Sequence, residues 1–384
     1  MNIAIIGHKG IPARAGGVER HVEEVAVRMA RQGHAVSSYV RNNYTDRNLA
    51  AYKGVRLIHL PSIGTKHLDA ISHTLLSTLH ALSRSYDIVH FHSIGPATLC
   101  WIIRLLKRRS TLIATFHSRD YLHRKWGLPA RLYLRMGEYL ICTVPHATVV
   151  LTRGQQRYVR DTYGTDTDVI PNGYAIQPDP GIGELAAWDL APKSYILSVC
   201  RLIPHKGVHY LIDAFMQLED EGRLPAGMRL VIVGSGFHTD DYERQLHERG
   251  CGRPSIIFTG TQSGAALAQL YSHARLFVQP SDSEGLSIAL LEAMGCGVAP
   301  LVSSIPENTE PLQGLGFTFT AGSVDALKNR LAETVNSGDV PAMGRKVQEL
   351  AERDYNWDGI TGRYLRLYAR VRAGAGPCGP EKTT

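Results

Sequence analysis

Two glutamates stand eight positions apart in the segment Pro280–Met294, with the turn Gly285-Leu-Ser between them: Glu284 precedes the turn and Glu292 follows it. If Leu286 opens a helix, the first free N–H groups of that helix favour a diphosphate. Carboxylates accept paired hydrogen bonds from vicinal hydroxyls, so one glutamate suits a sugar and the other a ribose. Two acids on an ordinary amphipathic helix would show the same spacing. The surrounding residues must therefore decide between a ligand site and such a helix.

Two cations form a second candidate group. Arg201 ends an apolar strand pattern, and Lys206 follows it just before a helical pattern that begins at Val208. Cations at the carboxyl end of a strand can clamp a diphosphate, arginine as a planar fork and lysine as a mobile point charge. Together they could neutralise a departing nucleoside diphosphate without a metal ion. The pair is weak evidence alone and gains weight beside the two glutamates.

A glycine-rich loop, Gly7–His21, follows the first expected strand and enters a helix near Gly17. The adjacent Gly16 and Gly17 let the backbone approach a ligand closely, and a helix N-terminus favours negative charge. The loop lacks the Gly-x-Gly-x-x-Gly dinucleotide fingerprint. A turn that only starts the helix is the alternative to a ligand-lining loop.

Two histidines, His92 and His117, end expected strands. A histidine at such a rim can donate a hydrogen bond to a sugar hydroxyl or stabilise charge at the anomeric carbon. Most strand-end histidines are only satisfied polar groups, which is the alternative here. His117 is the stronger candidate because a basic and aromatic segment follows it.

Positive charge is concentrated in the first half of a chain that has 42 Lys and Arg against 35 Asp and Glu. A surface of this kind attracts an anionic leaflet or a lipid-pyrophosphate acceptor, whereas a solvated helix face is the alternative. Nucleic acid is not an expected partner, because no helix-turn-helix, zinc or RNP-type signature accompanies the charge. The basic residues and the aromatic ones among them are Arg104, Lys107, Arg108, Arg109, Arg119, Tyr121, His123, Arg124, Lys125, Trp126, Arg131, Tyr133 and Arg135.

Short β-branched runs alternate with helical patterns throughout, which predicts an α/β protein with two doubly wound, Rossmann-like domains. The first set of strands is expected at 3–6, 35–40, 55–59, 88–92, 111–116, 147–151 and 168–170. The second set is expected at 195–200, 229–233, 256–259, 276–279 and 299–302.

Turn-forming residues cluster at 171–174 and 177–183, where the periodicity is lost. We therefore predict an N-terminal acceptor domain at 1–174 and a C-terminal nucleotide-sugar domain at 175–355. A helix at 356–372 and a disordered tail at 373–384 complete the chain. Ligands of such folds bind at the carboxyl ends of the strands, which predicts a site in a cleft between two facing domains.

At 384 residues, with 44% hydrophobic and 20% charged residues, the chain is typical of a globular protein of two domains. Its six cysteines are scattered without metal spacing, which favours a reducing compartment. No secretion signal is visible, and no apolar run reaches the roughly 20 residues of a membrane span. These features predict a cytoplasmic protein that is soluble or peripheral on the inner face of the membrane.

The motifs, taken in order, resemble the retaining glycosyltransferases of the group 1, family 4 type, which have the GT-B fold. The resemblance rests on Gly16-Gly-Val-Glu-Arg-His21, Arg201-x4-Lys206, Glu284-x7-Glu292 and the closing Tyr355-Asn-Trp-Asp, and it spans nearly the whole chain. Ile305-Pro-Glu-Asn308 adds a finer similarity to the bacterial polysaccharide-assembly branch that includes rhamnosyltransferases. The chain departs from the family pattern at Ala299-Pro300 and at Ser304, which puts local loop geometry and donor selectivity in doubt.

The resemblance implies a role for each matching residue. Arg201 and Lys206 would hold the donor diphosphate, and Glu284 the hydroxyls of the donor sugar. Leu286 and Ser287 would bind the phosphates through backbone N–H groups, while Glu292 holds the ribose. Gly16 and Gly17 would line the donor and acceptor region, His117 would touch the transferred sugar, and Trp357 would be structural.

We therefore expect a glycosyltransferase that moves a hexose-type sugar from a nucleoside diphosphate to a hydroxyl acceptor, a glycan or lipid-linked glycan, with retention of configuration. No cofactor and no metal are expected, because Arg201 and Lys206 can take the leaving charge. A GT-B nucleotide-sugar 2-epimerase and a non-catalytic nucleotide-sugar-binding protein are the alternatives.

Overall fold

The computed structural model describes residues 1–14, 16–65, 68–122, 127–236 and 240–374. The chain forms two compact units: Met1–Asn172 with Trp357–Thr384 is unit 1, and Gly173–Asn356 is unit 2. The division falls inside the turn-rich stretch at 171–174. Most of the tail predicted to be disordered, residues 375–384, lies outside the described residues.

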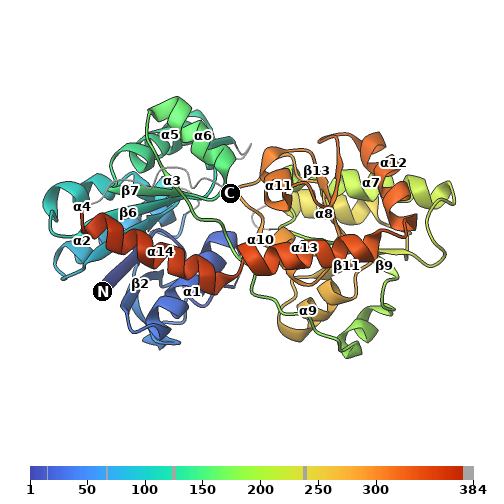
Figure 1. Cartoon of the computed structure of the whole chain (residues 1–384), viewed down its shortest axis with the longest axis horizontal. Coiled ribbons are helices and arrows are strands. Elements are labelled where there is room, and N and C mark those ends of the chain that lie inside the picture. Colours follow the sequence, from blue (N-terminus) through green and yellow to red (C-terminus); the bar gives the residue numbers. More distant parts are fainter. Residues whose placement is uncertain (15, 66–67, 123–126, 237–239, 375–384) are drawn as a thin grey trace. The chain divides into compact units, whose positions relative to one another are not determined.

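Unit 1 is built on an eight-stranded sheet in the order β3-β4-β2-β1-β5-β6-β7-β8 (Figure 1). All neighbours run parallel except β3 and β4, which are antiparallel. The sequence pattern missed only the two-residue β3. The strands are β1 (Asn2–Ile6), β2 (Ala35–Arg41), β3 (Ala51–Tyr52), β4 (Val55–Leu60), β5 (Ile88–His92), β6 (Thr111–Phe116), β7 (Ala147–Val150) and β8 (Asp168–Val169).

The last helix, α14, belongs to unit 1 and packs against α1 (Figure 1). Its inner face carries Trp357, Tyr364 and Tyr368, each at most 1% exposed, so Trp357 is a core residue. The helical elements of unit 1 are α1 (Gly17–Arg31), α2 (Leu68–Leu82), α3 (Ile94–Ala97), α4 (Cys100–Leu106), η1 (Asp120–Leu122), α5 (Leu128–Thr143), α6 (Arg153–Tyr163) and α14 (Trp357–Arg372).

Unit 2 is built on a six-stranded, wholly parallel sheet in the order β11-β10-β9-β12-β13-β14. The strand expected at 299–302 begins one residue later, at Pro300, a first position at which proline is tolerated. The pattern missed the short β14. The strands are β9 (Tyr195–Val199), β10 (Arg229–Val233), β11 (Ile256–Gly260), β12 (Leu276–Gln279), β13 (Pro300–Ser303) and β14 (Phe317–Phe319).

The helices of unit 2 cover its sheet and close a core in which Leu211, Phe215, Ile232 and Leu301 are fully buried. They are η2 (Gly183–Trp188), η3 (Pro204–Lys206), α7 (Val208–Asp220), α8 (Asp240–Arg249), α9 (Gly264–Ser272), α10 (Ile288–Gly295), α11 (Pro306–Thr309), η4 (Glu310–Leu312), α12 (Val324–Asn336) and α13 (Val340–Asp354).

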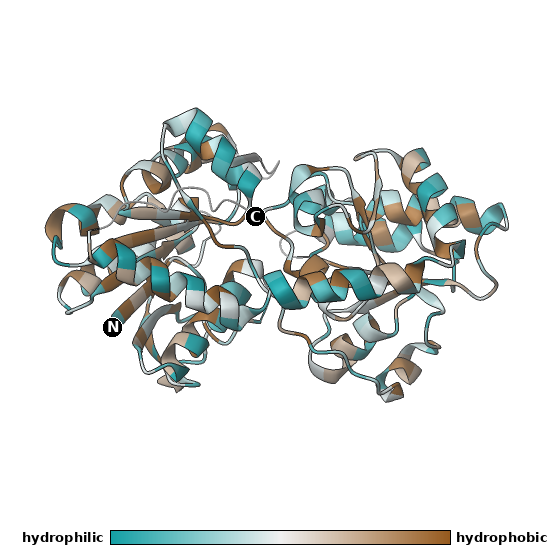
Figure 2. Cartoon of the chain, in the orientation of Figure 1, coloured by the Kyte–Doolittle hydropathy of each residue, from teal (hydrophilic) through white to brown (hydrophobic). Residues whose placement is uncertain are grey.

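The strands of both sheets are strongly apolar, whereas α14 alternates hydrophilic and hydrophobic residues (Figure 2). That contrast follows from burial, because parallel strands are covered on both faces and a surface helix on one. The predicted α/β class with two Rossmann-like parallel sheets is confirmed. Among the described residues, no helix is long and apolar enough to cross a membrane.

Candidate functional site

Two loops of unit 2 meet at the carboxyl ends of β9 and β12, which are neighbours in the sheet. The backbone N–H of Asp282 donates to the carbonyl of His205 at 2.8 Å. Gly207 has φ +68°, and a Cβ there would lie 2.1 Å from the carbonyl oxygen of Pro280. Only glycine fits this approach. The loop that carries Lys206 is therefore packed directly on the loop that carries Glu284.

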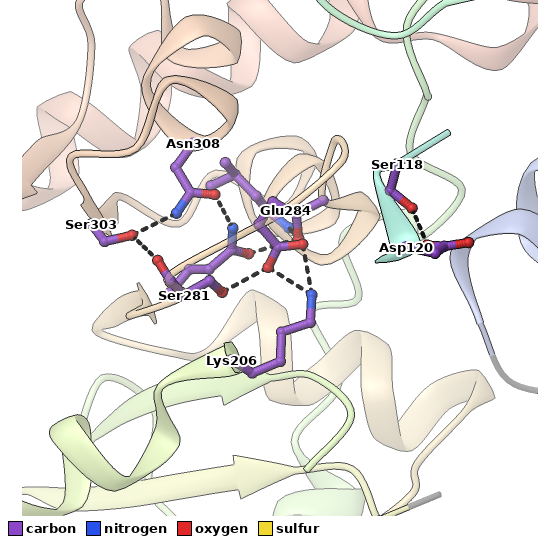
Figure 3. Close-up of polar contacts among 10 residues, drawn as sticks. Ser118, Asp120, Lys206, Ser281, Glu284, Ser303 and Asn308 are labelled. Carbon is purple, nitrogen blue, oxygen red and sulfur yellow. Dashed lines mark hydrogen bonds and ion pairs between the residues drawn. The ribbon is translucent and has the colours of Figure 1, made fainter. Parts of the chain in front are cut away.

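Lys206 and Glu284 form an ion pair between these loops (Figure 3). The Lys206 Nζ donates to both carboxylate oxygens at 2.6 Å, and the two side chains are 15% and 6% exposed. The Ser281 hydroxyl donates to Glu284 Oε1 at 2.6 Å. Sequence reasoning gave the lysine and the glutamate separate roles, and the structure brings them together as one unit of no net charge.

Polar side chains behind the pair fix the backbone of its loop (Figure 3). The Ser303 hydroxyl donates to the carbonyl of Ser281, and Asn308 Nδ2 donates to that hydroxyl at 2.9 Å. Gln279 Nε2 donates to Asn308 Oδ1, and the Ser287 hydroxyl donates to Gln279 Oε1 at 2.6 Å. All five residues are buried. Only Ser287 was a candidate from the sequence, although Asn308 ends the Ile-Pro-Glu-Asn motif quoted for the resemblance.

Helix α10 begins at Ile288, so the expectation that Leu286 opens it is wrong. Ser287 is the N-cap: its backbone is extended, at ψ 115°, and its hydroxyl accepts from the N–H of Leu290. A serine side chain that satisfies an N–H of the first turn stops the helix from starting earlier. Leu286, 6% exposed, lies in the approach to the helix. Any ligand held by the helix N-terminus would therefore meet the N–H groups of Ile288 and Ala289.

Glu292 lies on α10, is 8% exposed, and accepts a hydrogen bond from the Tyr271 hydroxyl of α9 at 3.2 Å. Burial first, and then the negative charge of Glu292, raise the pKa of the neighbouring Cys296 thiol to about 12. Glu292 is thus a buried acid held by a tyrosine, on the helix that follows the Glu284 loop.

The remaining cation, Arg201, lies two residues beyond β9 and is exposed. Asp282 is exposed too and accepts from the Tyr210 hydroxyl at 3.2 Å. The carboxyl edge of the unit 2 sheet therefore carries both an exposed guanidinium and a part-buried ammonium–carboxylate pair. This arrangement suits an anionic ligand that carries hydroxyl groups.

In unit 1, His92 and His117 form one hydrogen-bonded pair at the ends of the adjacent strands β5 and β6. His92 Nδ1 lies 3.0 Å from His117 Nε2. Burial first, and then the neighbouring histidines, hold the pKa of each ring well below its ordinary value. Both rings are therefore neutral at physiological pH. Sequence reasoning ranked one above the other, and the structure makes them partners.

His21 completes this group, and the sequence analysis missed it although it ends the quoted Gly-Gly-Val-Glu-Arg-His motif. Its Nδ1 lies 2.8 Å from Asn172 Oδ1, and its ring centroid lies 5.0 Å from that of His117. Donor atoms of His21, His92 and His117 all lie within 4.8 Å of one another. Three neutral imidazoles at this spacing could hold a transition metal ion, and the hydrogen bonds that they already make describe an ordinary polar cluster equally well.

Helix α1 begins at Gly17 with Gly16 as its N-cap. Gly16 has φ +101°, and a Cβ there would lie 2.3 Å from Glu19 Oε2. The other carboxylate oxygen of Glu19 accepts from the N–H of Lys9 at 3.2 Å. A carboxylate already occupies the first turn, so the positive end of α1 is partly compensated before any ligand arrives.

Two family models match the chain, one in each half. Residues 189–353 match the model described as glycosyl transferases group 1, and residues 15–177 match the model described as glycosyltransferase family 4.

Curated relatives carry the same activity in their names. The chain is 27% identical over 214 residues to the O-antigen chain mannosyltransferase B of Escherichia coli, a match that covers 55% of this chain and 54% of that protein. It is 25% identical to a GDP-mannose-dependent alpha-(1-6)-phosphatidylinositol monomannoside mannosyltransferase of Mycobacterium tuberculosis, over 94% of this chain and 97% of that protein.

Solved structures share the fold at lower identity. The sucrose-phosphate synthase of Thermosynechococcus elongatus has a TM-score of 0.80 at 21% identity, covering 97% of this chain and 100% of that one. HepE of Anabaena, in complex with UDP and glucose, has a TM-score of 0.77 at 19% identity, covering 96% of this chain and 99% of that one.

Proposed function

The chain belongs to the group 1 glycosyltransferases with the GT-B fold, and on that premise we propose that it moves a hexose from a nucleoside diphosphate to a hydroxyl acceptor with retention of configuration. The observation that carries the proposal is the Lys206–Glu284 pair, which lies, like the exposed Arg201, at the carboxyl edge of the unit 2 sheet. Cations and hydroxyl acceptors are what a nucleotide-sugar requires.

Each candidate site residue of unit 2 has a proposed role in holding the donor. Arg201 and Lys206 bind the diphosphate, and Glu284 accepts hydrogen bonds from the sugar hydroxyls. The N-terminus of α10, approached through Leu286 and capped by Ser287, adds backbone N–H groups for a phosphate. Glu292 accepts from the ribose hydroxyls.

Unit 1 is proposed to contribute the acceptor side. Gly16 and Gly17 bring the backbone close to the ligands. The neutral His117, held by His92 at 3.0 Å, donates a hydrogen bond to the transferred sugar.

The proposed reaction needs no covalent intermediate. The bond between the anomeric carbon and the phosphate oxygen breaks, the acceptor hydroxyl attacks from the same face, and the leaving phosphate accepts its proton. Asp282 is an alternative nucleophile on this loop, and its exposed side chain bonded to Tyr210 does not favour that role. Unchanged turnover of Asp282→Asn is the expected result.

The reaction is proposed to be independent of metal. Arg201 and Lys206 can absorb the charge of the departing diphosphate, and no Asp-x-Asp motif follows β12. Turnover is expected to survive chelation by EDTA. If chelation abolishes turnover and Zn²⁺ restores it, His21, His92 and His117 become the first site to test.

The donor and acceptor are proposed from the relatives and from the charge of unit 1. GDP-mannose comes first because it is named for the mycobacterial relative, and dTDP-rhamnose and UDP-glucose are the matched rivals. A lipid-linked glycan is the proposed acceptor, met at an anionic membrane surface by the basic segment that includes Arg131 and Arg135.

The test is calorimetry with this donor panel, followed by release of nucleoside diphosphate with and without acceptor. Release that depends on acceptor supports transfer. Release without acceptor together with an epimerised sugar would identify a 2-epimerase, and binding without any release would identify a non-catalytic nucleotide-sugar-binding protein.

A further inference from the structure

Helix α2 in unit 1 has its polar face inside and its apolar face outside. Three of the buried hydroxyls donate to the carbonyl four residues earlier in the same helix, at 2.7 Å each, so their burial leaves no unsatisfied donor. The buried residues are His73, Thr74, Ser77, Thr78 and Ala81. The exposed leucines are Leu68, Leu75, Leu76 and Leu79, between 38% and 50% exposed.

Helices α4 and α5 continue this apolar exterior. All three helices belong to unit 1 (Figure 1), and α4 packs against both α2 and α5. On α5 the exposed side chains recur at helical spacing, which is the pattern of one continuous stripe. The exposed residues are Trp101, Leu105 and Leu106 on α4, and Leu128, Leu132, Met136 and Tyr139 on α5, between 43% and 70% exposed.

This clustering is not a general property of the surface. Among the described residues, every large hydrophobic side chain that is exposed lies between Ile63 and Tyr139, except Ile182 in unit 2. Single exposed leucines need no explanation, whereas a gathered set marks an interaction surface.

The charge around the apolar set is positive. Glu138 is the one acid within α4 and α5; it is 1% exposed and accepts hydrogen bonds from the hydroxyls of Tyr158 and Tyr163 at 2.6 Å. It therefore offers no outward negative charge. The exposed cations of the same region are Arg84, Arg104, Arg108, Arg109, Arg131 and Arg135.

We propose that the outer faces of α2, α4 and α5 form a docking surface for an anionic lipid bilayer. The leucines and Trp101 enter the boundary between headgroups and acyl chains, and the arginines pair with lipid phosphates. This inference rests on the proposed function in one respect: it identifies the face of unit 1 that would meet the membrane in which the acceptor lies. Binding to lipid itself requires no sugar transfer, so the two can be tested separately.

A pocket on α5 fits one lipid headgroup. It has a volume of about 250 Å³ and is lined by Tyr121, Leu128, Arg131, Leu132 and Arg135. The guanidinium of Arg135 lies over the Tyr121 ring at 5.4 Å. Two arginines beside two leucines suit a phosphate whose acyl chain continues along the apolar stripe.

A second copy of the chain is the rival occupant of this surface. In a two-fold symmetric dimer the same patch meets itself, so arginines would be set against arginines with no exposed acid on α4 or α5 to compensate. The charge therefore favours lipid phosphate over another copy.

The test is binding of the full chain to vesicles, without donor or acceptor. Vesicles rich in phosphatidylglycerol are expected to bind the protein, and vesicles of pure phosphatidylcholine to bind it at least about tenfold more weakly. The intrinsic fluorescence is expected to shift to the blue, and Trp101→Phe to remove the shift.

Matched variants assign the binding to this face. Leu76→Gln with Leu79→Gln should weaken binding at least about tenfold, because each leucine buried in an apolar environment is worth roughly that factor. Arg131→Glu with Arg135→Glu should weaken binding to anionic vesicles and reduce its salt dependence. Ile182→Gln and Arg345→Glu, exposed positions in unit 2, should leave binding unchanged.

Three outcomes would overturn the docking surface: no binding to anionic vesicles at low salt, equal losses in the unit 2 controls, or a dimer that the leucine variant dissociates without any binding to vesicles. Sugar transfer to a water-soluble acceptor is measured in parallel with vesicle binding. If the unsubstituted chain fails to bind anionic vesicles but still transfers sugar, the surface alone is rejected. If it binds these vesicles but transfers no sugar, the proposed function alone is rejected.

Discussion

Lys206 and Glu284 neutralise each other at 2.6 Å with both side chains largely buried. A diphosphate that reaches this edge must therefore compete with a carboxylate for the same ammonium. Sugar hydroxyls can take over the carboxylate as donors while the lysine turns to the phosphate. In the proposed donor site, the pair would keep a part-buried cation compensated until a ligand that has both groups arrives.

Lys206→Ala is expected to lower turnover by roughly 10²- to 10³-fold, the scale of losing one charge-stabilising donor. Steady-state kinetics with the preferred donor measure the loss. Lys328→Ala is the matched control, since Lys328 pairs with Glu221 at 2.9 Å in the same unit and is also largely buried, at 17% exposed. Equal kinetics in the two variants would remove Lys206 from the mechanism.

The two glutamates are expected to separate binding from transfer. Glu284→Ala should lower transfer about 10²-fold and leave nucleoside diphosphate affinity within about threefold, because it frees Lys206 for the phosphate. Glu292→Ala should weaken nucleotide affinity about 10- to 100-fold, the scale of a lost charged hydrogen bond. Calorimetry and kinetics on both variants test this, and identical effects would show the sugar and ribose assignments to be wrong.

Residue types and spacing were enough to propose Arg201, Lys206, Glu284 and Glu292 as site residues, and that assignment stays a prediction. They could not reveal that Lys206 is bonded to Glu284, because that contact depends on β9 and β12 being neighbours in the sheet. His21 was missed for the same reason: its partner Asn172 is 151 positions away in the chain.

At the scale of elements, glycines let the two site loops pack together. Gly207 ends η3 in the left-handed region and lies against Pro280, and Gly234 approaches the carbonyl of Cys200 in the same way. Both contacts bring backbone against backbone near the Lys206 loop. The position of the ammonium is therefore set by main-chain packing as much as by its partner.

Gly207→Ala is expected to destabilise unit 2 by about 1–3 kcal/mol or more, through strain and the clash with Pro280, and to weaken nucleotide binding. Gly222→Ala is the matched control: its φ of +62° is similar, but no atom lies within 4 Å of the added Cβ. Chemical denaturation and calorimetry measure both effects. Unchanged nucleotide binding in Gly207→Ala would contradict the role given to loop packing.

Strands and helices were largely predictable, because buried parallel strands and amphipathic helices have distinct periods. The start of α10 was misplaced because the Ser287 hydroxyl caps the N–H of Leu290 and holds Leu286 outside the helix. The sequence also did not predict that α2 buries its polar face and exposes its apolar face. The spacing of residues shows which of them share a helix face, but not which face is buried.

At the scale of the whole molecule, buried neutral histidines are gathered in unit 1. Burial lowers the pKa of His8 and His90 to about 3 and that of His21 and His73 to about 4, and holds His92 and His117 well below the ordinary range. In unit 2, the half-buried His209 also has a lowered pKa. The two units should therefore respond differently to acid.

Unit 1 is expected to lose stability before unit 2 as the pH falls below about 6.5, the ordinary pKa of an unfolded histidine. Below that pH the histidines are protonated in the unfolded chain but stay neutral in the folded unit. The free energy of unfolding therefore falls by about 1.4 kcal/mol per pH unit for each such histidine. Urea denaturation at neutral and mildly acidic pH, followed by limited proteolysis and mass spectrometry, tells the units apart. Equal acid sensitivity in both units would contradict this account.

The most direct test of the central claim is hydrogen–deuterium exchange of the full chain with and without the nucleoside diphosphate that binds best. We expect protection at residues 201–207 and 281–292, and its loss in Lys206→Ala at the same nucleotide concentration. A tightly bound nucleotide that protects neither segment would contradict the donor site proposed for this chain.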